Sequence, residues 1–297
     1  MASDPQPSGE SSARAESTSA STTVDAVRER LDRVTDPELD TSIVELDYVE
    51  EIRIDDGEVF VAFTLPTAWC SPAFAWMMAA DARDQVESLP GVDRAEIDLR
   101  EHMHEREINR GINEGLPFGE AFPDADGDVV PVRAELDRKA RIARQHDATG
   151  ALLDAGLSGD QIVALTDDDV AWPDRDPLGA TGDDDDDDRL TVWVPDGSLA
   201  VRVDADPLVR YREKAAVTGV VDDDHPELCR TPEGEPIDAG EFELVRQRTR
   251  LAGVNMGGQG TVCDALNDAR HAADRPPLSM REGGPVVPDE SDRADAD

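Results

Sequence analysis

The N-terminal third of this 297-residue sequence predicts a small two-layer α/β domain, and the remainder predicts a mainly helical and α+β extension. Apolar residues recur at helical spacing in two early segments, residues 24–34 and 71–89. Apolar and polar residues alternate, as in half-buried strands, in three others: residues 47–54, 58–65 and 92–99. The Asp-Gly pair at 56–57 separates the first two strands and is a strong local hairpin signal.

The ends of these elements carry their own signals. Thr22 or Thr23 can cap the first helix, and Pro37 ends it because proline disfavours the helical conformation in the residue before it. Ser71 is an N-cap candidate for the second helix, with proline at the next position. The order is therefore helix, strand, strand, helix, strand over roughly residues 22–100, which is enough for one compact domain.

Beyond residue 100 the pattern predicts mostly helices. A short polar helix is expected near 101–115, a long one over 132–153 and a shorter one over 158–165, opened by Ser158. Residues 190–203 predict a hairpin, and two more helices are expected, at 207–217 and 242–251.

Composition divides the chain into six regions. We expect a disordered leader (1–22), the α/β domain (23–100), a helical extension (101–166), an acidic linker (167–189), a small α/β region (190–273) and a disordered tail (274–297). The like charges of the linker, which ends in the run Asp183 to Asp188, would keep it extended and mark a mobile junction.

The charge of the chain limits its partners. The formal net charge is -39 and only two residues, Lys139 and Lys214, are lysines. Such a chain repels phosphates and anionic membrane surfaces, so neither nucleic acid nor membrane is an expected partner. Scarce lysine with dispersed acids predicts a halophilic, salt-adapted protein. The alternative, an acidic disordered protein, fits only the two ends of the chain.

The cysteines indicate a reducing compartment. The chain has an odd number of cysteines, Cys70, Cys229 and Cys263. Its first residues lack the apolar core of a secretory signal. We therefore expect a cytoplasmic protein with free thiols. The sequence contains no run of about 18 apolar residues, so no membrane span is predicted.

Cys70 is the residue with the clearest chemical potential. It follows the second strand and immediately precedes a helix start, where unpaired amides and the helix dipole favour an anion. The thiolate is the form that binds iron or attacks an electrophile. The alternative is a buried structural cysteine, which is a common fate of a lone thiol.

The motifs around Cys70 resemble the SufT/PaaD-type iron–sulfur cluster assembly family. The segment DPELDTSIVELDYVEEIRIDDGEVFVAFTLPTAWCSP contains the acidic turn (Asp36, Glu38), two strands, Thr64, Thr67 and a single cysteine, and a Pro-Gly-Val turn follows at 90–92. Two positions depart from the family pattern: Asp47 replaces the usual glycine, and Ser71 separates Cys70 from its proline.

The resemblance implies an accessory role without catalytic turnover. The protein would assemble or deliver iron–sulfur clusters, or help an iron-containing enzyme to mature. Cys70 would be a transient ligand of the iron or the cluster. Asp36, Glu38 and Thr67 would support that site, although turn chemistry is the favoured explanation of the acidic pair. A client apo-protein or the cluster assembly machinery would be the partner.

Other metal-ligand types occur in two places. His102 and His104 alternate after the third strand and could face one metal, although a solvent-facing pair is favoured because two histidines make an incomplete site. His225, Cys229 and Cys263 form a weaker set, because their spacing is not a zinc signature.

Two further function classes stay open. Cys70 could be the nucleophile of an enzyme with His102 or His104 as its base, although a complete catalytic set is missing from the sequence. The chain could also be a non-catalytic interaction module in which the region beyond the domain recognises a client. The sequence leaves the client, the cluster type and the oligomeric state open.

Overall fold

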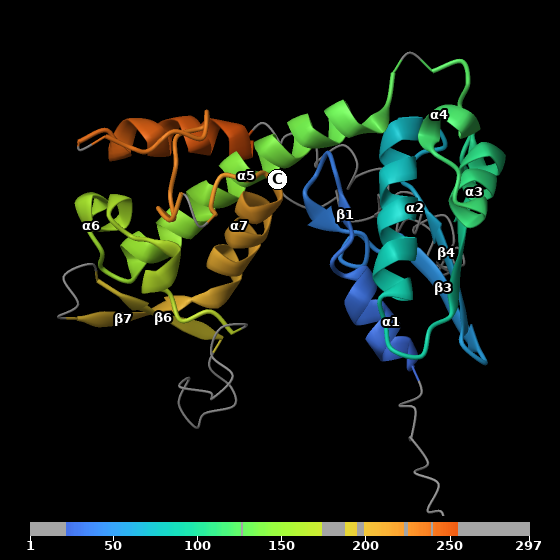
Figure 1. Ribbon diagram of the computed structural model, residues 1–297, viewed down its shortest axis with the longest axis horizontal. Helices are drawn as coiled ribbons and strands as arrows, with labels where there is room; N and C mark the ends of the chain where they lie inside the picture. Colours follow the sequence, from blue (N-terminus) through green and yellow to red (C-terminus); the bar gives the residue numbers. More distant parts are fainter. Residues whose placement is uncertain are drawn as a thin grey trace, which may run out of the picture.

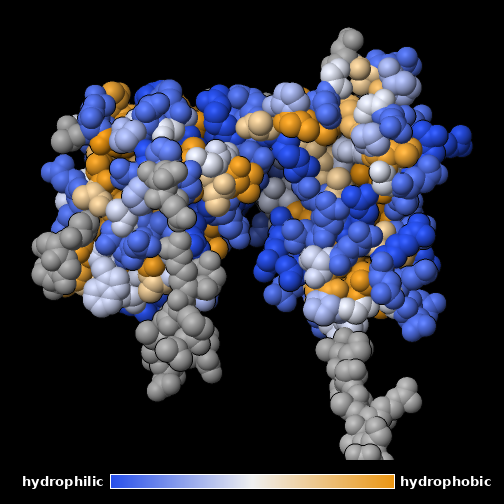
Figure 2. All heavy atoms as spheres, viewed as in Figure 1, coloured by the Kyte–Doolittle hydropathy of each residue, from blue (hydrophilic) through white to orange (hydrophobic). Residues whose placement is uncertain are grey.

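The computed structural model describes residues 22–125, 127–173, 188–194, 199–222, 225–238 and 240–254. These residues form two lobes joined by one long helix, α5 (Val129–Asp154), which crosses from one lobe to the other (Figure 1). We call residues 22–125 the N-terminal module and residues 129–254 the C-terminal module. On the face shown in Figure 2, most of the surface of both lobes is hydrophilic, and an open gap separates the lobes below α5.

The N-terminal module has the predicted mixed α/β order. Its elements are α1 (Val24–Leu31), β3 (Val49–Asp55), β4 (Glu58–Thr64), α2 (Pro72–Glu87) and β5 (Arg94–Arg100). The strands lie in the order β3-β4-β5, with β3 antiparallel and β5 parallel to β4. The hairpin turn needs Gly57, whose φ is +89°, a conformation that costs glycine little.

Alternation along the strands builds the core of this module. Val59, Val61 and Phe63 of β4 are buried, as are the matching residues of β5, and they share one apolar cluster with α1 and α2. On the other face, the Arg53 guanidinium lies 4.1 Å from the centroid of the Phe60 ring. One face of the sheet is therefore apolar and covered by helices, and the other is polar.

Two short elements frame the acidic turn and were not predicted. β1 (Thr35–Asp36) and β2 (Thr41–Ser42) pair antiparallel on either side of it. Farther along, Asp47 has φ of +55°, so the position at which the resembled family usually has glycine does need the left-handed conformation. Aspartate tolerates this conformation better than most residues.

The core of the N-terminal module extends past residue 100, which was expected to end the domain. α3 (Glu105–Glu114) and α4 (Phe118–Ala121) follow β5 and add Ile108, Ile112 and Phe118 to the same apolar cluster. Gly111 makes this packing possible, because a Cβ there would lie 2.5 Å from the Trp76 ring. The segment after residue 115, for which no helix was predicted, contains the four-residue α4 because its aromatic residues pack on Trp76.

Side chains of α3 close the outer edge of β5. Asn109 accepts a hydrogen bond from the Leu99 amide at 2.9 Å and donates to the Leu99 carbonyl at 3.0 Å. Asn113 does the same at Ile97, at 2.9 and 2.8 Å. The two asparagines therefore satisfy the backbone groups that an exposed edge strand would offer to another chain.

The C-terminal module packs a second core around the far half of α5. Its elements are α6 (Gly159–Val163), β6 (Arg189–Trp193), β7 (Ala200–Asp204), α7 (Ala205–Val217) and a last helix over 242–254. β6 and β7 pair antiparallel, as expected, although residues 195–198 of the predicted turn lie outside the described residues. Residues from 148–165 and from 190–245 share one apolar cluster. The expected division between residues 101–166 and 190–273 is therefore absent from the core.

The first part of the expected acidic linker belongs to this core. Trp172 is 1% exposed, and its indole Nε1 donates to the Asp167 carbonyl at 2.9 Å. Val170 is buried and forms a bridge with Val192 of β6. These apolar residues hold residues 167–172 in the core, so that stretch is not an extended linker. Residues 174–187 lie outside the described part of the chain.

Polar pairs connect the two modules. Arg144 of α5 donates two hydrogen bonds to the Asp40 carboxylate, at 2.6 and 2.8 Å, and both side chains are buried. Arg210 of α7 donates to the Asp40 carbonyl at 3.0 Å. Asp81 of α2 pairs with Arg133 of α5 at 2.8 Å. The acidic turn of the N-terminal module is therefore an anchor point for the C-terminal module.

Within the described residues, no helix is long and apolar enough to cross a membrane.

Candidate functional site

Cys70 lies on a short loop between β4 and α2, two residues before the first residue of α2. Its side chain is half-buried and packs against the edge of the N-terminal core. Ser71 occupies the N-cap position of α2, but its side chain makes no capping hydrogen bond. Cys70 is therefore neither fully buried nor fully exposed.

Thr67 fixes the inner side of this loop. Its hydroxyl lies 3.6 Å from the Cys70 sulfur and accepts a hydrogen bond from the Trp69 amide at 3.1 Å. The Cys70 amide donates to the Thr67 carbonyl at 3.4 Å. Because the hydroxyl already accepts from Trp69, its proton is available to the sulfur, and a thiolate would accept it.

His102 fixes the loop from the other side. Its ring Nδ1 accepts a hydrogen bond from the His104 amide at 3.2 Å, so Nδ1 carries no proton. Nε2 is then the protonated nitrogen, and it donates to the Cys70 carbonyl at 3.0 Å. The Met103 amide donates to the Ala68 carbonyl at 3.0 Å. The 66–70 loop and the 101–104 loop are therefore joined at two points.

His102 is 5% exposed, so the expectation of a solvent-facing histidine pair is wrong for this residue. Burial lowers its pKa below the usual 6.5, which keeps the ring neutral and able to accept from His104. Glu101, directly before it, has φ of +57°. This left-handed turn redirects the chain after β5, so that the imidazole points back toward Cys70.

His104 lies at the rim of the site. Its ring meets the Phe122 ring edge-on at 5.5 Å, and its Nδ1 lies 3.9 Å from a Glu107 carboxylate oxygen. The rings of His102 and His104 are 6.1 Å apart and tilted by 50°. Both ring nitrogens of His102 are hydrogen-bonded to backbone groups. In this geometry neither nitrogen can act as a base toward the Cys70 thiol, and neither can bind a metal together with His104.

Asp36 and Glu38 lie in the turn that faces the C-terminal module. One oxygen of Asp36 accepts from the amides of Glu38 and Leu39, at 2.9 and 3.3 Å, and the other accepts from the Tyr48 hydroxyl at 3.4 Å. Burial raises the pKa of both carboxyl groups, against these hydrogen bonds in the case of Asp36. Asp36 is thus used in turn chemistry, and its hydrogen bonds link it to Tyr48 and the turn, not to Cys70.

The two described members of the weaker ligand set lie in different environments. Cys229 is 1% exposed within the C-terminal core, and burial raises the pKa of its thiol to about 12. His225 is exposed and pairs with Asp222 at 2.9 Å. Cys263 lies outside the described residues. Over the described part of the chain, no group of three or more His, Cys, Asp or Glu side chains could hold a metal ion.

The structure adds two residues that the sequence reasoning passed over. Trp69 is 76% exposed and Met103 is 52% exposed, and they flank Cys70 on the two joined loops. The available signal was a tryptophan directly beside the cysteine in a loop.

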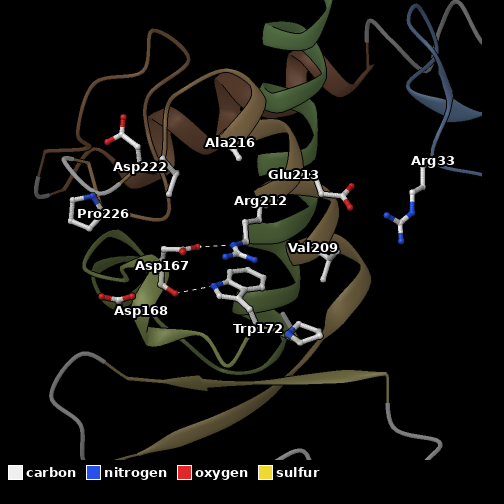
Figure 3. A pocket seen from close by; sticks show the side chains of 12 residues that line it. Arg33, Asp167, Asp168, Trp172, Val209, Arg212, Glu213, Ala216, Asp222 and Pro226 are labelled. Carbon is white, nitrogen blue, oxygen red and sulfur yellow. Dashed lines mark hydrogen bonds and ion pairs between the residues drawn. The ribbon is translucent and has the colours of Figure 1, made fainter. Parts of the chain in front are cut away.

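A separate pocket of about 680 Å³ lies between the modules (Figure 3). On its C-terminal side, the Arg212 guanidinium lies 4.5 Å from the Trp172 ring centroid and donates to Asp167 at 3.1 Å. Arg33 of the N-terminal module extends toward Glu213 of α7 (Figure 3). None of its lining residues belongs to the two loops around Cys70.

Comparison with known proteins identifies the family to which the chain belongs. The family described as "Iron-sulfur cluster assembly protein" matches residues 24–99. An uncharacterized protein of Methanocaldococcus jannaschii, MJ1129, is 31% identical over 93 residues, which cover 31% of this chain and 96% of that protein. The chain belongs to the iron–sulfur cluster assembly family.

The assembly domain so identified contains the Cys70 loop, the acidic turn and all of the three-stranded sheet except Arg100, the last residue of β5. The match ends at residue 99, so α3, α4 and the C-terminal module lie beyond it. No solved structure matches the chain.

Proposed function

We propose that the assembly domain carries iron or an iron–sulfur cluster on the Cys70 thiolate and passes it to a client apo-protein or to the cluster assembly machinery. The observation that carries this proposal is the placement of the thiol. It lies half-exposed on a loop that Thr67 and His102 hold from two sides. Membership of the iron–sulfur cluster assembly family supports iron or an iron–sulfur cluster as the cargo.

A single thiolate suits a carrier better than a resident cluster site. Iron in these clusters is usually held by four cysteine thiolates in all, whereas Cys70 supplies one. The remaining ligands would come from sulfide, small thiols or the client. Because few bonds hold the cargo to the chain, release to a client with more thiolates is thermodynamically favourable. Thr67 and His102 are positioning residues in this scheme. Thr67 orients the sulfur, and His102 orients the loop.

The C-terminal module would contribute to the choice of client. It is anchored to the acidic turn of the assembly domain through Arg144 and Arg210, so it keeps a defined position relative to that domain. Specificity needs more contact surface than one loop supplies. A salt-adapted protein in a reducing cytoplasm remains the setting that the composition favours.

The test is metal loading of the full chain in the absence of oxygen. Iron and acid-labile sulfide are measured after reconstitution of the wild type, Cys70→Ser and Cys229→Ala. We expect Cys70→Ser to lose the cargo and Cys229→Ala, a buried control, to keep it. Equal iron and sulfide in wild type and Cys70→Ser would contradict the proposal.

A further inference from the structure

The surface around Cys70 has an apolar centre that the fold leaves uncovered. Trp69 and Met103 are 76% and 52% exposed, and the bond from the Met103 amide to the Ala68 carbonyl holds their loops together. Phe122 adds a half-buried ring beside His104. We call Trp69, Met103 and Phe122, together with Cys70, the Cys70 rim. An exposed indole on a fixed loop is the kind of side chain that dominates binding energy at interfaces.

The charges next to the Cys70 rim are mainly acidic. Glu101 and Glu107 are exposed and Glu105 is half-exposed on the segment that carries His102 and His104, and within residues 101–107 they outnumber one exposed cation, Arg106, by three to one. Glu105 is close enough to His102 to favour its protonated form. Glu107 approaches His104 at 3.9 Å. An apolar centre beside carboxylates fits a surface with an apolar recess and arginine or lysine around it.

We propose that the Cys70 rim docks a client protein whose surface has these features: an apolar recess for the Trp69 indole, basic side chains around it and a cysteine thiolate inside. This inference rests on the proposed role of Cys70 and names its partner. A second copy of this chain is disfavoured as the occupant, because each copy has a net charge of -39 and the same carboxylates would face each other.

Docking would place the two sulfurs at one iron. The client thiolate forms an iron–sulfur bond while the bond from Cys70 to that iron breaks, so one thiolate replaces another. Cys70 leaves with its electron pair and takes up a proton from water, whereas the client thiol has given up a proton. No electron is transferred, and the iron keeps its charge.

The test measures peptide binding by fluorescence anisotropy at equal iron content per chain. The probe is a short labelled peptide with leucines, arginines and a cysteine, and its matched forms carry glutamate for arginine or serine for leucine. Trp69→Ala is compared with Trp193→Ala, a control tryptophan that is 50% exposed in the C-terminal module. We expect Trp69→Ala to weaken binding about tenfold or more and Trp193→Ala to leave it unchanged. Either matched peptide should bind more weakly than the basic one.

Three results would overturn the inference. They are equal affinity of wild type and Trp69→Ala, equal affinity for the basic and acidic peptides, or no binding of the basic peptide to wild type. A loaded wild type that forms dimers in light scattering, with dimers lost in Trp69→Ala, would make the second copy the occupant instead. Absence of iron from wild type would defeat the proposed function separately, since peptide binding is still measurable on the metal-free chain.

Discussion

Cys70 in the N-terminal module and Cys229 in the C-terminal module lie in opposite environments. The N-terminal module holds Cys70 just before a helix, half-buried and with its sulfur beside the Thr67 hydroxyl. The C-terminal module buries Cys229 in an apolar core next to Tyr211, where burial raises the pKa of both groups. The same functional group is therefore partly accessible in one module, and in the other it is buried, with its pKa raised. A thiol's position in the fold, more than its presence in the sequence, decides what it can do.

The largest expected difference is in the reactivity of the two thiols. With a pKa of about 12, only about one Cys229 in ten thousand is a thiolate at pH 8. Burial restricts reagent access as well. We expect Cys70 to be alkylated at least about a thousandfold faster than Cys229 in the folded chain.

Iodoacetamide labelling of Cys70→Ser and Cys229→Ala, both with Cys263→Ser, measures the two rates. Unfolding in urea is the control, because it should bring the two rates close together. A native Cys229 that reacts as fast as Cys70 would remove the contrast between the modules.

The next effect concerns the pair that anchors one module to the other. Asp40→Ala leaves the Arg144 charge buried without its carboxylate, which typically costs about 3–5 kcal/mol. Asp40 also has φ of +53°, which asparagine tolerates well. We therefore expect Asp40→Asn to destabilise less than Asp40→Ala, as measured by urea denaturation. Equal and small losses would show that the modules do not depend on this pair.

A smaller effect is expected at the closed edge of the sheet. Asn109→Ala removes three hydrogen bonds to β5 and Asn113→Ala removes two, at about 0.5–1.5 kcal/mol per bond. The double variant should also self-associate, because the β5 edge is then exposed. Urea denaturation and light scattering test both effects. A stable, monomeric double variant would show that α3 packing alone protects the edge.

The smallest effect is a pH dependence of the metal-free protein. Burial lowers the pKa of His102 in the folded state, so the unfolded chain binds more protons near pH 6. The stability from the neutral ring is fully present above pH 6.5 and is lost as the pH falls toward the folded pKa. His102→Gln should have a flatter stability profile below pH 6.5. His146, whose pKa is also lowered, stays the same in both proteins. Identical slopes would mean that His102 is not held neutral.

The sequence predicted most of the N-terminal fold because its signals are local. Alternation, the Asp-Gly turn and the Ser-Pro helix start each depend on neighbouring residues, and β3, β4 and α2 appear within a few residues of their expected bounds. The inclusion of α3 and α4 in the first core was missed. It depends on Gly111 lying against Trp76, a contact between residues far apart in the chain.

The candidate site was predictable only in part. Cys70 and Thr67 are close in the sequence, so their proximity follows from the loop. The contact from His102 to the Cys70 carbonyl crosses 32 positions and depends on the turn at Glu101. The role of Trp172 was missed for the same reason: an acidic segment predicts a linker, whereas one buried indole fixes that segment in the core. The salt dependence of stability stays a prediction.

Protection of Cys70 by its cargo tests the central claim most directly. Alkylation of Cys70 and Cys229 is followed by mass spectrometry in the metal-free chain, after loading with iron and sulfide, and after removal of the metal by a chelator. We predict that loading slows alkylation of Cys70 strongly, that the chelator restores the rate, and that Cys229 changes in neither step. Cys70 that reacts at the same rate with and without bound iron would contradict its role as the ligand.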